Sequence, residues 1–209
     1  DFLGNLDPSD NFGSAVAAVG DMNGDGVEDI AVGAMDDDDG GPARGAVWIL
    51  FLKSDGTVKG HQKISSDEGL FDGELADSDA FGRSVAALGD VDGDGVTDLA
   101  VGAYGDDEGG QDAGSVWILF MTADGKVKHQ QKISNASQAI DGGIEKQDLF
   151  GSSLTALGDV VGDNVPDLAV GAPFDDQGGF DRGAVWILTL QPNGDVKDAT
   201  KIASGLGGF

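Results

Sequence analysis

The sequence predicts an all-β fold built from three tandem copies of one four-stranded antiparallel unit. One observation is a constant period of 69 residues, with no insertion or deletion between copies. Its clearest marks are the pairs Phe12-Gly13, Phe81-Gly82 and Phe150-Gly151. The other is that short apolar runs alternate with Asp- and Gly-rich loops, while no segment shows a helical period. Such a period indicates one supersecondary unit repeated in tandem. We place the repeats at 1–69, 70–138 and 139–209 of one continuous repeat domain.

Each repeat contains four runs of strand length, most clearly in the second copy. There they cover residues 84–88, 97–103, 115–120 and 127–133. The turn before the fourth run is Asp55-Gly56, Asp124-Gly125 or Asn193-Gly194. Pairs of this kind between apolar runs predict a hairpin with a type I′ turn, in which both central residues have positive φ.

The first and third strands of each repeat differ in the size of their side chains. The first is made of small residues, as in Ala15-Val16-Ala17-Ala18, whereas the third contains Val-Trp-Ile-Leu. A sheet that is narrow at one edge and wide at the other is a wedge, and wedges around an axis form a β-propeller with the small strand innermost. We expect the tryptophans to pack between neighbouring sheets, and a ligand-binding role is the alternative. They are Trp48, Trp117 and Trp186.

The composition limits the partners of the chain. Its 209 residues include 38 Asp and Glu against 12 Lys and Arg, a net charge of −26. This charge disfavours nucleic acid and anionic membranes as partners. No apolar run has the length of a membrane span, so we expect no membrane insertion. The absence of cysteine excludes disulfide and thiol chemistry. A start at Asp1 indicates a processed chain or a piece of a longer one.

The loop between the first two strands carries acidic residues in alternation. In the second copy it reads Asp90-Val-Asp92-Gly-Asp94-Gly-Val96-Thr-Asp98, with oxygen side chains at positions 1, 3, 5 and 9. Carboxylates so close repel one another unless a cation lies among them. Oxygen ligands without His or Cys favour Ca²⁺, and position 7 offers a backbone carbonyl. Solvated acidic turns are the alternative. The predicted calcium ligands are Asp21, Asn23, Asp25, Val27, Asp29, Asp90, Asp92, Asp94, Val96, Asp98, Asp159, Asp163, Val165 and Asp167.

The third loop departs from this pattern. Val161 stands at position 3, and Asn164 replaces the glycine at position 6. We expect Asn164 to adopt the left-handed conformation that Asn tolerates. Because the number of carboxylates tunes calcium affinity, we expect affinity to fall from the second loop to the first and then to the third. An empty third loop is the alternative.

Together these motifs resemble the FG-GAP pattern of integrin α-chain β-propellers and of many bacterial extracellular proteins. The stretch from Phe150-Gly151 to Gly171-Ala172-Pro173 has the pattern intact, whereas the other copies end in Met35 and Tyr104 instead of proline. The resemblance covers essentially the whole chain. It implies one propeller blade per repeat, Ca²⁺ in the hairpin loops, and adhesion or binding of a protein or glycan ligand outside the cell. Some propellers of the family are enzymes or adjoin catalytic domains.

Three blades are fewer than the four to eight that close a propeller. Phe209 is the repeat equivalent of Phe2 and Phe71, so the repeat phase continues to the last residue. We expect the end blades, through residues such as Trp48 and Trp186, to meet neighbouring blades. These belong to another copy or to another part of a longer chain, in a ring or a fibre. A closed three-bladed form is the alternative.

Catalysis has little support in the sequence, and we expect no enzyme. His61 and His129 do not occupy equivalent positions, and we expect both on the surface of the fourth strand. The basic residues look scattered, which gives no pocket for an anionic substrate. We interpret the second acidic loop, at 36–41 and its copies, as a solvated turn, with a cation or partner site as the alternative.

Three functions remain in order of preference. The first is an extracellular calcium-binding module for adhesion or ligand binding. The second is a calcium-stabilised building block that assembles with itself into a ring or an extracellular fibre. The third is a calcium-dependent propeller hydrolase.

Overall fold

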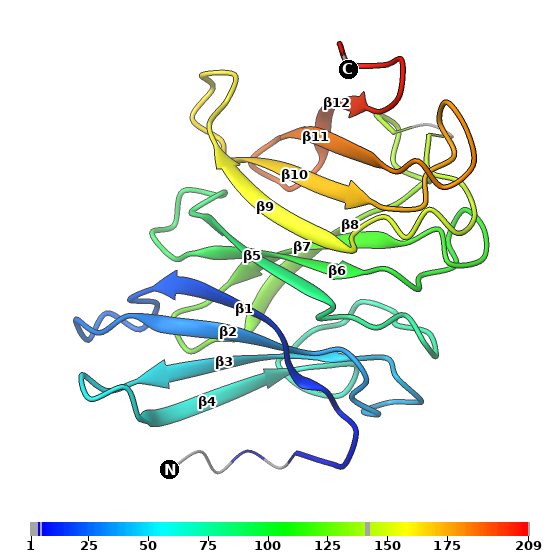
Figure 1. Cartoon of the computed structure of the whole chain (residues 1–209). Helices are drawn as coiled ribbons and strands as arrows, with labels where there is room; N and C mark the ends of the chain where they lie inside the picture. The colour runs from blue at the N-terminus through cyan, green and yellow to red at the C-terminus, as the bar shows by residue number, and fades with distance from the viewer. Residues whose placement is uncertain (1–3, 5, 141–142, 209) are drawn as a thin grey trace.

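The computed structural model describes residues 4, 6–140 and 143–208, which form twelve β-strands and no helix. The strands make three four-stranded antiparallel sheets, which we call blades 1, 2 and 3 in chain order (Figure 1). The predicted all-β fold with three propeller-like blades is therefore confirmed. No helix that could cross a membrane occurs in these residues.

Blade 1 consists of β1 (Phe12–Gly20), β2 (Asp29–Ala34), β3 (Ala46–Leu52) and β4 (Val58–Ile64). Blade 2 consists of β5 (Ser84–Gly89), β6 (Asp98–Ala103), β7 (Ser115–Met121) and β8 (Val127–Ile133). Blade 3 consists of β9 (Ser153–Gly158), β10 (Asp167–Ala172), β11 (Ala184–Leu190) and β12 (Val196–Ile202).

The blades stack in chain order, with blade 2 between the other two (Figure 1). Within each blade the strands follow one another from first to fourth. Across blades, the first strands β1, β5 and β9 lie side by side. These are the strands built from small residues, so the sheets approach most closely where their side chains are smallest. This arrangement agrees with the wedge predicted from the sequence.

The Phe-Gly pair of each inner junction lies between two blades. Phe81 is fully buried and pairs in parallel with Gly45 of blade 1, and its N–H donates to the carbonyl of Arg44 at 2.9 Å. A Cβ atom on Gly82 would lie 2.3 Å from the carbonyl oxygen of Ala46. Only glycine fits this position, because the backbones of two blades meet there.

Two apolar cores join the blades. The core between blades 1 and 2 contains Ile49 of β3 and Trp117 of β7, and the core between blades 2 and 3 contains Ile118 of β7 and Trp186 and Leu188. Neighbouring residues of β7 thus face opposite blades, as the period of a strand requires. Trp117 and Trp186 pack between sheets, as predicted.

The end faces differ from the expectation in one respect. Trp48 lies in a separate cluster on the outer face of blade 1, as expected. Trp186 is 5% exposed and packs toward blade 2, so the expectation that it lines an end face is wrong. The residues of β11 that line the outer face of blade 3 are instead Val185 and every second residue after it. Phe2 and Phe209 lie outside the described residues.

The hairpin turns also differ from the prediction. Gly56 and its equivalents have positive φ, but Asp55 and its equivalents do not. The N–H of Gly56 donates to the carbonyl of Lys53, and the N–H of Lys53 donates to the carbonyl of Thr57, both at 2.8 Å. This pattern is a type I turn followed by a glycine bulge, so the predicted type I′ turn is wrong. The longer turn lets the Asp55 carboxylate accept the N–H of Thr57 at 2.9 Å.

Gly82→Ala should destabilise the protein more than Gly13→Ala. Both glycines have positive φ, 90° and 96°, a backbone that costs a residue with a Cβ about 1–2 kcal/mol. Only Gly82 also faces a backbone, since no described heavy atom lies within 4 Å of a Cβ on Gly13. Denaturant unfolding of both variants measures the difference. Equal losses would contradict the role of Gly82 as the contact between blades.

Candidate metal centre

Each acidic loop joins the first two strands of a blade and curls around its first aspartate. In blade 2, Oδ1 of Asp90 accepts the N–H groups of Gly93 at 2.7 Å and Asp94 at 3.0 Å, and its Oδ2 accepts that of Gly95 at 2.8 Å. Gly93 and Gly95 have positive φ, which the tight curl requires. Asp21 and Asp159 accept loop N–H groups in the same way. The sequence thus folds the loop so that its carboxylates point inward.

The last aspartate anchors the loop to the sheet. Asp98 is fully buried, and its two oxygens accept the N–H groups of Val91 in the loop and Met121 at the end of β7, both at 2.9 Å. Burial and the charges of Asp92 and Asp94 raise the pKa of Asp98 to about 6, although these two hydrogen bonds lower it. Asp29 and Asp167 are anchored to Leu52 and Leu190 in the same way.

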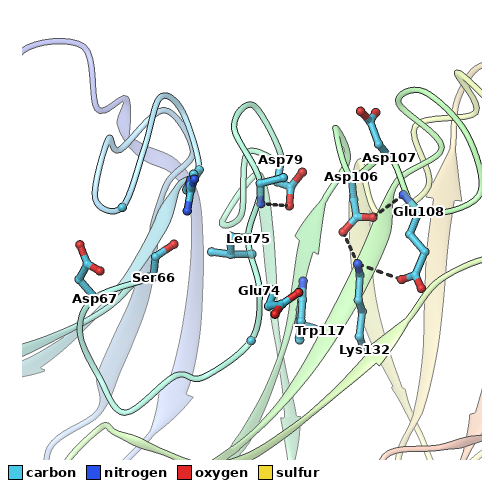
Figure 2. Close-up of a pocket in the computed structure, with 14 residues that line it drawn as sticks. Ser66, Asp67, Glu74, Leu75, Asp79, Asp106, Asp107, Glu108, Trp117 and Lys132 are labelled. Atoms are coloured by element: carbon cyan, nitrogen blue, oxygen red, sulfur yellow. Dashed lines mark hydrogen bonds and ion pairs between the residues drawn. The ribbon is translucent and has the colours of Figure 1, made fainter.

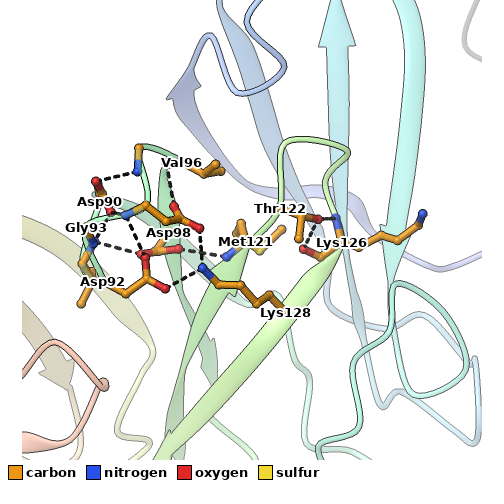
Figure 3. A network of polar contacts seen from close by, with 12 residues as sticks. Asp90, Asp92, Gly93, Val96, Asp98, Met121, Thr122, Lys126 and Lys128 are labelled. Carbon is orange, nitrogen blue, oxygen red and sulfur yellow. Dashed lines mark hydrogen bonds and ion pairs between the residues drawn. The ribbon is translucent and has the colours of Figure 1, made fainter.

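Carboxylate oxygens converge most closely in blade 2. One oxygen from each of Asp90, Asp92 and Asp98 lies within 4.8 Å of the others (Figure 3). Three hard anionic donors this close match the ligand chemistry of Ca²⁺, whereas the His and Cys ligands that zinc and copper prefer are absent from this cluster. Each oxygen that accepts one N–H retains a second lone pair for a cation. Asp94 instead accepts the N–H of Val96 at 2.9 Å and pairs with Lys128.

The first and third loops bring fewer carboxylates together. In the first, the side-chain amide of Asn23 donates to Asp29 at 2.8 Å, and Asp25 pairs with Lys59. In the third, Val161 is exposed at position 3, and Asp163 pairs with Lys197 at 2.6 Å. Asn164 has a φ of 66°, so its predicted left-handed conformation is confirmed. The structure gives no carbonyl contact for Val27, Val96 or Val165, and their role as ligands remains a prediction.

Sequence reasoning missed a lysine that reaches into every one of these loops. The residues are Lys59, Lys128 and Lys197, at the same position of the fourth strand in each repeat. The Nζ atom of Lys128 lies 2.6 Å from Asp92 and also pairs with Asp94 (Figure 3). These hydrogen bonds raise the pKa of Lys128 above its ordinary value. The basic residues are therefore not scattered, and comparison of the three copies position by position would have shown it.

The second acidic loop is also more structured than predicted. Its buried aspartates, which are 1–2% exposed, form ion pairs with a second repeated lysine of the fourth strand. The pairs are Asp37–Lys63, Asp106–Lys132 and Asp175–Lys201. The interpretation as a solvated turn is wrong for these positions, because each aspartate is shielded from water by its own blade. A charge buried in this way needs a partner, which the lysine supplies.

A pocket of ≈ 960 Å³ opens beside one of these pairs, on the rim between blades 1 and 2 (Figure 2). Glu74, Asp79, Asp106, Trp117 and Lys132 line it. Asp79 is 3% exposed, and its Oδ2 accepts the N–H of Ala76 at 2.8 Å. Burial raises the pKa of Asp79 to about 6, and the nearby charge of Asp106 contributes. The histidines are not part of this pocket, and both His61 and His129 are exposed as expected.

Asp79→Asn should stabilise the protein at pH 7. The pKa of Asp79 is near 3.8 in the unfolded chain and about 6 in the fold, so the folded state binds more protons between these values. Its contribution to stability therefore falls as pH rises from about 4 to about 6 and stays low above that range. The amide removes the buried charge and still accepts the N–H of Ala76. Melting temperatures are measured from pH 4 to 7. That of the variant should exceed that of the wild type at pH 7 and should vary less with pH. The exposed Asp67→Asn serves as the control, and a loss of stability at pH 7 would contradict the interpretation.

Comparison with known proteins agrees with the geometry. The family model of the FG-GAP repeat matches residues 12–50, 81–119 and 150–188. Integrin alpha-PS2 of Drosophila melanogaster is 35% identical over 189 residues, which is 88% of this chain and 12% of that protein. Integrin alpha-5 of Xenopus laevis is 33% identical over 208 residues, which is 93% of this chain and 16% of that protein. The chain thus spans less than a fifth of the length of these relatives.

The three matches coincide with the three blades, from the Phe-Gly pair of each to its tryptophan-bearing third strand. The similarity to integrin alpha chains extends over most of the sequence. The chain belongs to the FG-GAP repeat family.

Proposed function

We propose that this chain is an extracellular, calcium-dependent module for adhesion or ligand binding. The observation that carries the proposal is the convergence of Asp90, Asp92 and Asp98 within 4.8 Å in the loop of blade 2. The similarity to integrin alpha chains supports a role at the cell surface with a protein as ligand. A glycan ligand fits the same proposal. We infer binding without catalysis, because the repeated ion pairs give Asp37, Asp106 and Asp175 a structural role.

Electrostatics supports a cation in these loops. The chain carries a net charge of −26, and Asp98 places one of its carboxyl groups in a fully buried position. Lys128 supplies one positive charge to Asp92 and Asp94, but the loop holds four aspartates. A divalent ion would balance more of this charge than the lysine alone does. It would bind through oxygen donors of the loop and would hold the first two strands of the blade together.

Calcium should raise the melting temperature of the protein. A ligand that binds only the native state stabilises it by about 2.7 kcal/mol per site at a hundredfold excess over Kd. Calorimetry in millimolar calcium and in excess chelator measures this gain. Asp90→Asn should reduce the calcium-dependent gain, whereas the control Asp124→Asn, in an exposed turn, should leave it intact. A melting temperature that does not respond to calcium would refute the metal site.

Lys128→Gln should make the protein more dependent on calcium. Without the ammonium, Asp92 and Asp94 repel each other more strongly, so the melting temperature in chelator should fall. The same change removes a positive charge that competes with the ion, so calcium should bind more tightly in isothermal titration. Lys126→Gln is the matched control, because Lys126 pairs with Asp124 outside the loop at 2.6 Å. Equal calcium affinity in the two variants would show that Lys128 does not share the site.

Adhesion is tested with the immobilised chain. Cells should attach in millimolar calcium and detach in chelator, and Asp90→Asn should weaken attachment at low calcium. Attachment that is indifferent to calcium would separate adhesion from the metal site.

Self-assembly is a second candidate function, and one observation favours it. Large apolar side chains are exposed on the outer faces of the two end blades, among them Val16 of blade 1 and Val185 of blade 3. Inside the chain, the corresponding faces are covered by a neighbouring blade. A hydrolase has no comparable observation in its favour.

A further inference from the structure

The outer face of blade 3 exposes side chains that are buried in the other two blades. Val185 is 43% exposed, whereas its counterparts Val47 and Val116 are 0% exposed. Val160 is 59% exposed, whereas Met22 and Val91 are 4–5% exposed. In blades 1 and 2 these positions are covered by the next blade. The two internal junctions therefore show what this face accepts.

A groove of ≈ 820 Å³ lies on this face. Its lining includes Ser153, Gly171, Gly183 and Val185. Gly183 is the counterpart of Gly45 and Gly114, which pair in parallel with Phe81 and Phe150 of the following blade. The groove therefore occupies the position where an internal junction holds the Phe-Gly pair.

Polar groups of the groove also match the internal junctions. Ser153 is the counterpart of Ser84, whose hydroxyl donates to the carbonyl of Gly151 in the next blade at 2.6 Å. At the same junction the carbonyl of Ala113 accepts the N–H of Phe150 at 2.9 Å. Its counterpart in blade 3 is the carbonyl of Arg182, at the edge of the groove. The face thus offers both a hydroxyl donor and a carbonyl acceptor to an incoming Phe-Gly pair.

Blade 1 presents a segment with the required shape. Ser9, Asn11 and Gly13 have φ values of 81°, 52° and 96°. The counterparts before blade 2, Ser78, Ala80 and Gly82, have 74°, 57° and 90°. The segment before blade 1 has thus already adopted the conformation that docks at the internal junction. Val16 beside it is 62% exposed, whereas its counterpart Val85 is 8% exposed against blade 1.

We propose that the groove of blade 3 binds blade 1 of a second copy of this chain, with the pair Phe12-Gly13 in the place that Phe81-Gly82 takes inside the chain. This contact joins copies head to tail and continues the stack of blades. It rests on the assembly function proposed above, and none of its residues belongs to the proposed calcium sites.

One position limits the strength of this contact. Phe51 and Phe120 pack under the hairpin turn of the next blade, where a Cβ on Gly125 or Gly194 would lie 3.1–3.2 Å from their rings. Thr189 is their counterpart in blade 3 and offers a smaller, polar side chain. Repulsion between chains of −26 charge opposes the contact as well, and salt screens it. We therefore expect an association weaker than the internal junctions.

The test is a dilution series followed by light scattering, at physiological salt in millimolar calcium. The wild-type chain should form species of two or more copies at high concentration. Val16→Glu and Val185→Glu each block one face and should each remain monomeric. Mixed together, they should form a dimer of two chains and nothing larger, because each supplies the face that the other lacks. Leu70→Glu, at an exposed position of the first connection, should assemble as the wild type does. Thr189→Phe should shift assembly to lower concentration.

The outcomes are distinguishable. A wild-type chain that stays monomeric at every concentration overturns the proposal together with the assembly function. Assembly that persists in Val16→Glu and Val185→Glu, or a mixture that stays monomeric, overturns the assigned contact and leaves assembly by another surface. Circular dichroism of each variant checks that it is folded. Should either glutamate variant unfold, the response of Thr189→Phe decides, and unchanged assembly there also overturns the contact.

Discussion

The structure depends on how closely two backbones approach between blades. A Cβ on Gly33 would lie 2.0 Å from the carbonyl oxygen of Gly82, and one on Gly102 would lie 2.1 Å from that of Gly151. The Phe-Gly and Gly-Ala motifs are thus the two sides of one contact, in which glycine faces glycine. Because this contact recurs with the 69-residue period, it sets the spacing of the sheets and places the loops of successive blades in equivalent positions. It also leaves each end of the stack with half of the contact.

Charge is organised by the same repeat. The chain has only 12 basic residues, and six of them form two rows of repeated lysines on the fourth strands. One row, which includes Lys128, pairs with the acidic loops that join the first two strands of each blade. The other row, which includes Lys132, pairs with the buried aspartates of the second acidic loop. Each lysine of the second row lowers the cost of an aspartate that its own blade buries, whereas the partners of the first row are exposed or half-buried. The remaining carboxylates include buried aspartates such as Asp79 and Asp98, and those that face solvent are screened by salt.

The elements were predictable from the sequence because each carries a local signal. Strands such as Val127–Ile133 are found within one residue of their expected bounds, since apolar runs and glycine-rich loops alternate sharply. The turn type predicted at Gly56 was wrong because an Asp-Gly pair fits two kinds of turn. The choice between them depends on the hydrogen bond from the N–H of Lys53 to the carbonyl of Thr57, which lies outside the pair. The partners of Asp106 and Asp92 were missed for a different reason. Lys132 and Lys128 come from another strand, and only the register of the sheet brings them to these carboxylates.

Two positions at which the third repeat departs from the other two lie in its acidic loop and on its outer face. Val161 removes a potential ligand, and Thr189 removes a ring that fills the junction in blades 1 and 2. Both changes lie on the blade that has no neighbour on its outer side in this chain (Figure 1). Thr189 places less apolar surface on that face than Phe51 and Phe120 do in their blades, which lowers the cost of exposing the face to water. Since repulsion between acidic chains opposes the docking of two copies, cations bound in the loops of both copies would favour it. The proposed metal sites and the proposed docking face would therefore be coupled through charge, although no residue belongs to both.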